Sequence, residues 1–230
     1  MSSREELRNQ LQAGLVRDIF KMERAYFLIQ EISAKGSDID KNHDYIELFQ
    51  IIQNSLLTEA VMAVSRIYDK PSKKYPTNCL QSILSFIENN VNNLIPIIEK
   101  PNLQRHLYKI DAPDYLISSL NKDNDILYTQ MLVEHFKILC FTGENKDRIL
   151  KLKNIRDKRI AHNENNPIIN NPTLIDLKDL IKNTQKVIGT IGWSYLSPAQ
   201  VYIIEGKYLL SDDARRVSVS LKKLLDTVLN

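Results

Sequence analysis

The sequence contains little glycine and little proline, with 6 and 8 residues of each type among 230. A sandwich or barrel of many strands needs a turn about every 8–12 residues, so this scarcity of turn residues argues against both. Neither GxGxxG nor GxxxxGK[ST] occurs, and the chain therefore has no glycine-rich loop for binding phosphate.

Cysteine is also rare, since Cys79 and Cys140 are the two present and both have apolar neighbours. They form neither a disulfide framework nor a CxxC metal site, so we expect two buried thiols in a reducing compartment. The four histidines have no metal-ligand spacing, and HExxH and GxSxG are absent. The sequence therefore predicts neither a metal nor a cofactor.

Long hydrophobic runs and a large net charge are missing as well. The longest apolar runs, AVMAV and LIPII, are too short to span a membrane, and the charged start MSSREELRNQ lacks the apolar core of a signal peptide. We expect a soluble, cytoplasmic protein without membrane contact. The 31 basic and 28 acidic residues give a net charge of +3, which excludes a binder that is basic all over but permits a local basic patch.

What the sequence does contain is apolar residues at helical spacing, and 43% hydrophobic residues suffice for a core. The first helix is predicted from Ser3, in a capping box with Glu6, to Gly36, which would take the left-handed cap. Asp40 would cap the second helix. The following helices are predicted from Thr77, from Asp123 to Gly143, over 144–162, from Thr173 to between 189 and 192, and over 212–229.

Two segments interrupt this helical pattern. Residues 163–172 read NENNPIINNP and predict a loop, and residues 201–204 fit either a short strand or a helical turn. We predict one all-α domain over residues 1–230, a helical bundle with additional terminal helices.

Positive charge is concentrated around the helix predicted over 144–162. Between Lys137 and His162 the chain carries eight basic and three acidic residues, a local excess greater than that of the whole chain. At about 100° per residue, one face of this helix is apolar and the other is cationic. The predicted core face holds Ile149, Leu150, Leu152 and Ile160, and the predicted RNA contacts are Arg148, Lys151, Lys158 and Arg159.

Arg156 falls between Leu152 and Ile149 on the same helix, so it points inward. A buried guanidinium is costly without a partner, and we expect either an internal ion pair with Asp69 or Glu59, or a position at a protein interface. Arg66 and Asp69 lie three positions apart on the second predicted helix and could pair with each other.

The string from Arg156 to His162, RDKRIAH, resembles the signature of the HEPN superfamily, which is an arginine, a polar residue and a histidine a few positions later. The surrounding LKNIRDKRIAHNE and the segment SRIYD at 65–69 are similar to the abortive-infection branch of AbiU type. The resemblance covers about residues 40–192, taken as the HEPN-like core, and leaves 193–230 as a C-terminal extension.

This resemblance implies a metal-independent endoribonuclease that acts on RNA as a toxin or phage-defence effector. His162 would be the general acid or base at the 2′-hydroxyl, Arg156 would stabilise charge on the phosphorus, and Asp157 would orient one of the two. On a regular helix, Arg156 and His162 are about 120° and about 9 Å apart. Either the helix unwinds before His162, or a second subunit completes the site, so we expect a homodimer across this helix.

Other interpretations of the same residues stay open. The chain could be a non-catalytic HEPN module that binds nucleic acid or a nucleotide, or the helical partner of a nuclease encoded alongside. An antitoxin or regulatory protein is a further expected partner. His162 could serve only as a partner of the helix dipole, and His43, His106 and His135 are predicted to have no functional role.

Overall fold

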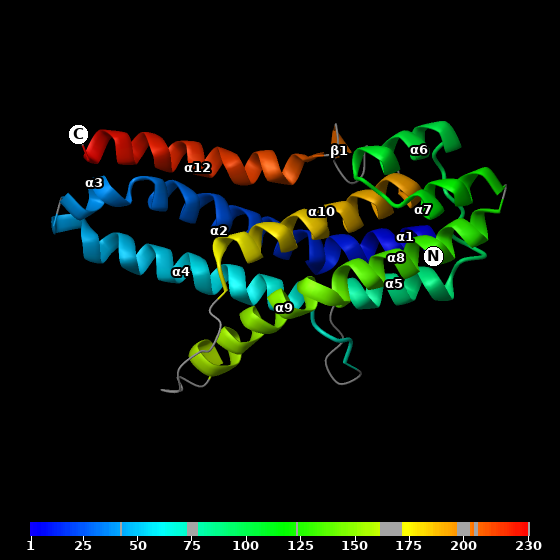
Figure 1. Ribbon diagram of the computed structural model, residues 1–230, viewed down its shortest axis with the longest axis horizontal. Coiled ribbons are helices and arrows are strands. Elements are labelled where there is room, and N and C mark those ends of the chain that lie inside the picture. Colours follow the sequence, from blue (N-terminus) through cyan, green and yellow to red (C-terminus); the bar gives the residue numbers. More distant parts are fainter. Residues whose placement is uncertain are drawn as a thin grey trace.

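The computed structural model describes residues 1–41, 43–72, 78–122, 124–161, 172–196, 203–204 and 207–229. These residues form an elongated helical bundle with its termini toward opposite ends of the long axis (Figure 1). Within them, β-structure is limited to β1 (Ile203–Ile204) and β2 (Lys207–Tyr208), which pair antiparallel. The all-α prediction is confirmed, and the segment around 201–204 contains the strand rather than the helical turn.

The first predicted helix is present but is built from three pieces: α1 (Ser3–Gln10), the π-helical η1 (Leu11–Leu15) and α2 (Val16–Ala34). Its N-cap is Ser2, whose side chain accepts a hydrogen bond from the Glu5 backbone N–H. The predicted capping box starting at Ser3 is therefore wrong by one position.

The connection to the next long helix also differs from the prediction. Gly36 does not take the left-handed conformation but begins a short helix, α3 (Gly36–Lys41), after the C-cap residue Lys35. Asp40 lies inside α3, so it does not cap the second long helix, α4 (His43–Ile67).

The remaining predicted helices are present in the predicted order with shifted ends, and shorter helical segments lie between the helices predicted from Thr77 and from Asp123 (Figure 1). They are α5 (Leu80–Asn89), α6 (Lys100–Lys109), α7 (Asp114–Ser119), the 3-10 turn η2 (Leu120–Lys122), α8 (Asp125–Phe141), α9 (Gly143–Ile155), the π-helical η3 (Arg156–Ala161), α10 (Leu174–Tyr195) and α12 (Leu209–Val228). No helix in the described ranges combines the length and apolarity needed to cross a bilayer.

The helix caps show where the local sequence alone was sufficient to predict a helix end. Thr173 caps α10 as predicted, in a capping box with Asp176. The cap of α8 is Asn124, while the predicted cap Asp123, the predicted helix start Thr77 and positions 163–171 of the predicted loop lie outside the described residues. Helix α10 continues past Gly189 to Tyr195, because its buried packing offsets the cost of about 1 kcal/mol that a glycine adds within a helix.

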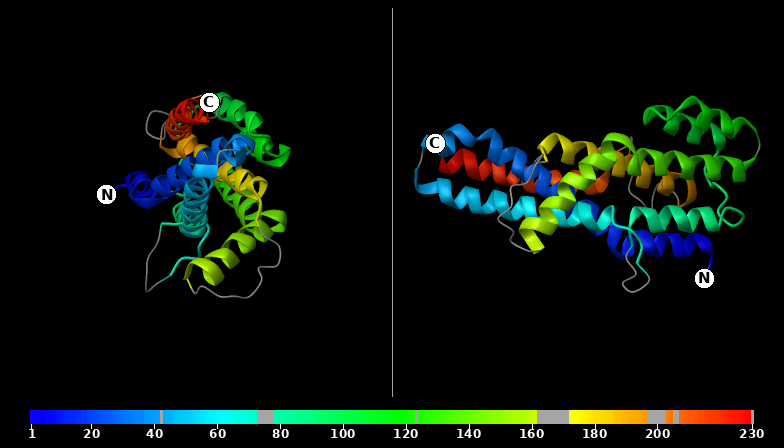
Figure 2. Two further views of the ribbon diagram at one scale, coloured as in Figure 1. Left: turned by 90° about the vertical axis from the view of Figure 1, so that its left-hand side faces the viewer. Right: turned by 60° about the horizontal axis from the view of Figure 1, so that its bottom comes forward.

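Helix α2 occupies the middle of the bundle, where it packs against α4, α10 and α12 (Figure 2). Its buried face contributes Ile19, Met22 and Tyr26 to the main core, and each such side chain stabilises the fold by about 1.5–3 kcal/mol. Cys79 and Cys140 are both buried free thiols, as predicted. This core fixes α4, α9 and α10 relative to one another, and these three helices carry the candidate site.

Candidate active site

Helix α9 carries the basic segment and runs obliquely to the long axis, in contact with α4, α8 and α10 (Figure 1). Ile149 and Leu152 are buried, as predicted for its apolar face. Leu150 was assigned to the same face but is 48% exposed, so this part of the prediction is wrong. The burial of Ile160 lies outside the described residues. A narrower apolar stripe than expected therefore holds α9 on the bundle.

The regular helix predicted over 144–162 ends at Ile155. From Arg156 to Ala161 the chain forms a π-helix, η3, in which each hydrogen bond spans five residues rather than four. The angular positions calculated at 100° per residue therefore do not apply beyond Ile155. Single π turns often occur at functional sites. His162 follows directly and lies outside the described residues, so its position relative to Arg156 stays a prediction.

Arg156, the first residue of the π turn, is held by two carboxylates. Its Nε donates to Asp157 Oδ1 at 2.7 Å and its Nη1 donates to Asp69 Oδ2 at 3.5 Å. The predicted ion pair with Asp69 is thus confirmed, whereas Glu59 binds Arg24 at 2.7 Å instead. The hydrogen bond to Asp157 raises the pKa of Arg156 despite partial burial, so the guanidinium remains charged.

Asp69 joins Arg156 to a second cation. Its Oδ1 accepts a hydrogen bond from Lys153 Nζ at 3.0 Å, and the same ammonium donates to the Tyr68 carbonyl at 3.1 Å. Lys153 was not identified as a site residue from the sequence, because no pattern in the chain links it to the end of α4. The pair of Arg66 with Asp69 that the spacing allowed does not form: Asp69 lies beyond the last turn of α4, and Arg66 binds Asp18 at 2.8 Å.

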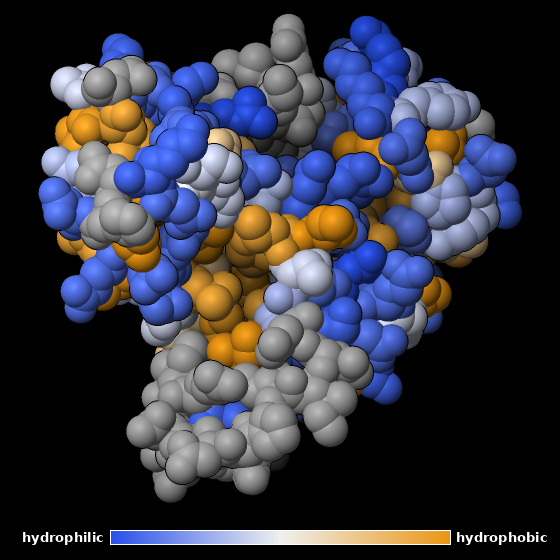
Figure 3. Space-filling model, turned by 60° about the vertical axis from the view of Figure 1, so that its left-hand side comes forward, coloured by the Kyte–Doolittle hydropathy of each residue, from blue (hydrophilic) through white to orange (hydrophobic). Residues whose placement is uncertain are grey.

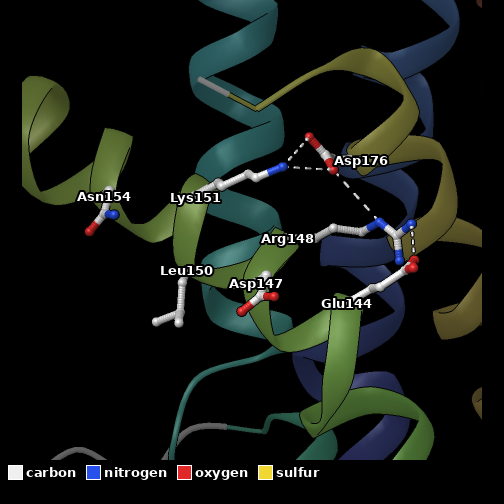
Figure 4. A pocket seen from close by; sticks show the side chains of 7 residues that line it. All are labelled: Glu144, Asp147, Arg148, Leu150, Lys151, Asn154 and Asp176. Atoms are coloured by element: carbon white, nitrogen blue, oxygen red, sulfur yellow. Dashed lines mark hydrogen bonds and ion pairs between the residues drawn. The ribbon is translucent and has the colours of Figure 1, made fainter. Parts of the chain in front are cut away.

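Two of the four predicted RNA contacts are already paired in the structure. Arg148 binds Glu144 at 2.9 Å, Asp179 at 3.0 Å and Asp176 at 3.6 Å, and only 19% of its side chain is exposed. Lys151 binds Asp176 at 3.4 Å. Figure 4 shows both cations reaching from α9 toward Asp176 on α10, around a pocket of about 460 Å³. These contacts attach α9 to α10.

Asp176 is ionised within this cluster. Burial raises its pKa, but hydrogen bonds from the Thr173 backbone and hydroxyl, together with the charge of Lys151, lower the pKa below its ordinary value. Of the other two predicted RNA contacts, Lys158 is half-buried and forms no ion pair with any described residue. The side chain of Arg159 lies outside the described part of the chain.

Comparison with protein families decides the family of the chain. The family model HEPN_AbiU2, described as AbiU2, matches residues 4–227. The chain belongs to the AbiU2 family of HEPN proteins. Neither the comparison with curated proteins nor the comparison with solved structures gave a match.

The AbiU2 match extends well beyond residues 40–192, on which the resemblance was recognised. It includes α2, whose Asp18 holds Arg66 of the SRIYD segment at 2.8 Å. It also includes most of α12, which packs along α2. In this AbiU2-family chain, the two segments that resemble the family, SRIYD and RDKRIAH, meet through the ion pair of Asp69 and Arg156.

His106 lies outside the HEPN motif, in the core of the bundle. His106 is buried, lies 3.0 Å from Thr190 Oγ1 and stacks on Trp193. Because the Thr190 hydroxyl donates its one proton to the Lys186 carbonyl, His106 Nε2 is the donor in this pair. Burial, with the charge of Lys109, lowers the pKa of His106 to about 4. His106 is therefore a neutral core residue.

Proposed function

We propose that this AbiU2-family protein is an endoribonuclease that needs no metal ion and acts as a toxin or phage-defence effector. The observation that supports this most directly is the state of Arg156. Its guanidinium is charged, held by Asp157 and Asp69, and begins the π turn that leads to His162. In this HEPN chain, Arg156 is therefore a fixed cation six residues before the motif histidine, His162.

In the proposed reaction His162 takes the proton of a ribose 2′-hydroxyl, and the 2′-oxygen attacks the adjacent phosphorus. The bond from phosphorus to the 5′-oxygen breaks, and that oxygen receives a proton from an imidazolium. The fragments end in a 2′,3′-cyclic phosphate and a 5′-hydroxyl. Arg156 suits the stabilisation of the charge on phosphorus, since its planar fork donates two hydrogen bonds to phosphate oxygens. Asp157 would orient Arg156, whose Nε it already binds.

We further propose that the active form is a homodimer across the motif-bearing helix. Apolar side chains on α4, α9 and α10 stay exposed near this helix: Leu57 is 37%, Leu150 is 48% and Ile175 is 68% exposed. Figure 3 shows apolar residues gathered in the middle of one face, with hydrophilic residues on either side. A second copy would cover such surface and supply a second HEPN motif to one cleft.

Lys158 and Arg159 are the proposed RNA contacts closest to His162 in the sequence. Lys158 has no carboxylate partner among the described residues, which leaves its charge available to a phosphate. Arg148 and Lys151 would first have to leave Asp176, so their proposed contribution to RNA binding is smaller.

Incubation with total RNA tests the proposal. Wild type in EDTA is expected to produce fragments with 5′-hydroxyl ends, which a polynucleotide kinase labels without prior phosphatase treatment. His162→Ala and Arg156→Ala should produce none while keeping the wild-type melting temperature. Cleavage that persists in His162→Ala would contradict the mechanism.

A second candidate function is supported by the same arginine. Arg156 has two carboxylate partners and only 25% of its side chain is exposed, which is also what a structural ion pair requires. In that case the chain would be a HEPN module that binds nucleic acid without cutting it. Tight, salt-dependent RNA binding by wild type, with the RNA left intact, would support this alternative.

A further inference from the structure

A groove of about 610 Å³ lies on the side of α9 opposite Asp176, between the end of α4, α5 and α8. Its lining includes apolar side chains, among them Phe141 and the buried Ile149. The charged residues that line it are four lysines and one glutamate: Lys70, Lys137, Lys146, Lys153 and Glu134. The lining of the groove therefore combines apolar side chains with an excess of positive charge.

Two of the four lysines are available to bind an anion. Lys137 is held by Glu88 at 2.7 Å, and Lys153 is held by Asp69 at 3.0 Å. Lys70 and Lys146 are exposed, and neither forms an ion pair within the described ranges. They lie at different elements, just beyond α4 and in the first turns of α9. A ligand with two negative charges along its length would suit this arrangement.

Polar side chains with hydrogen-bonding capacity left over also line the groove. Neither Gln81 nor Ser85, both on α5, forms a side-chain hydrogen bond with another described residue. Thr142 is the N-cap of α9, but its hydroxyl donates to the Ile138 carbonyl and caps no N–H of α9. Amide and hydroxyl groups of this kind can bind the edges of bases and ribose hydroxyls.

The groove is connected directly to the candidate catalytic arginine. Lys153 lines it and shares the carboxylate of Asp69 with Arg156, one cation on each oxygen. A strand whose phosphate lies at Arg156 would therefore reach the groove with its neighbouring nucleotides.

We propose that this groove binds single-stranded RNA beside the scissile phosphate, with backbone phosphates at Lys70 and Lys146 and a base on Phe141. Aromatic side chains and lysines together are the usual means of holding a single strand without sequence preference. The placement beside a scissile phosphate rests on the proposed ribonuclease function, whereas the binding of RNA in the groove does not.

The test uses the full chain with His162→Ala, so that RNA is not consumed, and a fluorescent short oligouridylate in anisotropy titrations over a series of salt concentrations. Lys70→Gln with Lys146→Gln is expected to weaken binding about tenfold and to reduce the slope of log K against log salt by about 1.4, since each phosphate contact in a single strand contributes about 0.7. The matched control is Lys222→Gln with Lys223→Gln, two exposed lysines on α12, which should match the His162→Ala parent in affinity and slope.

Phe141→Leu separates stacking from charge. It keeps most of the apolar volume, so it should weaken binding by about fivefold through lost stacking and leave the salt slope unchanged. Circular dichroism melts establish that each variant is folded before titration.

The outcomes distinguish the groove from the catalytic proposal. If the groove variant and the control variant bind RNA with equal affinity and equal salt slope, the proposal that the groove binds RNA is overturned. EDTA-resistant cleavage by wild type would then leave the ribonuclease proposal intact. If RNA binding depends on the groove lysines but wild type never cuts RNA, the proposal that the groove binds RNA is supported and the catalytic proposal is overturned. If labelled polyglutamate binds the His162→Ala parent and loses affinity in the Lys70→Gln, Lys146→Gln variant, while RNA binds both equally, the groove is a protein-binding site and the proposal is overturned.

Discussion

Asp69 Oδ2 accepts a hydrogen bond from Arg156 Nη1 at 3.5 Å, across 87 positions of sequence. The contact attaches the start of the π turn to the end of α4, and the other oxygen of the same carboxylate holds Lys153 on α9. One side chain thus fixes both the candidate catalytic arginine and the nearest lysine of the groove.

Asp69→Asn is therefore expected to lower the rate of RNA cleavage more than it lowers stability. The pair is partly exposed, with 38% of the Asp69 side chain accessible, so its contribution to stability is about 0–1 kcal/mol. Loss of the charge-assisted bond that orients Arg156 should reduce the single-turnover cleavage rate about tenfold. Rapid-quench assays and thermal melts on the same samples measure the two effects.

The control for this change is Asp226→Asn, which removes one of the two carboxylates that bind Lys35, toward the C-terminal end of the bundle. It should change the melting temperature by a similar amount and leave cleavage unaffected. A cleavage rate in Asp69→Asn equal to that of the control would show that Asp69 does not position Arg156.

Mixing two inactive variants tests the proposed composite site. If Arg156 of one subunit acts with His162 of the other, a heterodimer of Arg156→Ala and His162→Ala has one intact site. Random exchange of subunits should then restore about one quarter of wild-type activity. Light scattering should give twice the chain mass of 26.6 kDa for each variant. A monomer at micromolar concentration, or a mixture that stays inactive, is inconsistent with the composite site.

Local signals predicted much of this fold, and long-range partners account for most errors. The Thr173 cap was predictable because its partner Asp176 is three residues away. Two of the three carboxylate partners of Arg148 were not, because Asp176 and Asp179 lie on α10, beyond the loop, and a count of charges over 137–162 cannot include them. The π turn at Arg156 also escaped prediction, since apolar spacing reports a helical face and not whether hydrogen bonds span four or five residues.

Arg148→Ala is expected to destabilise the protein, because Arg148 joins α9 to two carboxylates of α10 with 19% of its side chain exposed. The loss leaves Asp176 and Asp179 without this partner and should cost about 1–2 kcal/mol, which lowers the melting temperature by about 2–8 °C. Arg105→Ala is the matched control, since its guanidinium makes an exposed hydrogen bond to Asn102 on the same helix. A melting temperature unchanged in Arg148→Ala, with weaker RNA binding, would instead assign Arg148 to the RNA surface as the sequence suggested.

Acidification should destabilise the fold through His106. Its pKa of about 4 in the folded state lies below the ordinary value of 6.5, because burial disfavours the imidazolium. The unfolded chain therefore binds the proton first as the pH falls. The contribution of neutral His106 to stability is complete above pH 6.5, declines between 6.5 and 4, and is absent below 4. At about pH 5 the loss relative to pH 7 amounts to about 2 kcal/mol.

Urea unfolding at a series of pH values measures this dependence in wild type and in His106→Gln. Glutamine retains an N–H donor for Thr190 but does not titrate, so the variant should be less stable than wild type at pH 7 and lose less stability toward pH 5. His135, whose pKa is also lowered by burial, contributes equally to both proteins and cancels in the difference. Parallel pH profiles for the two proteins would place the acid sensitivity elsewhere, because the one group that differs between them is the imidazole of His106.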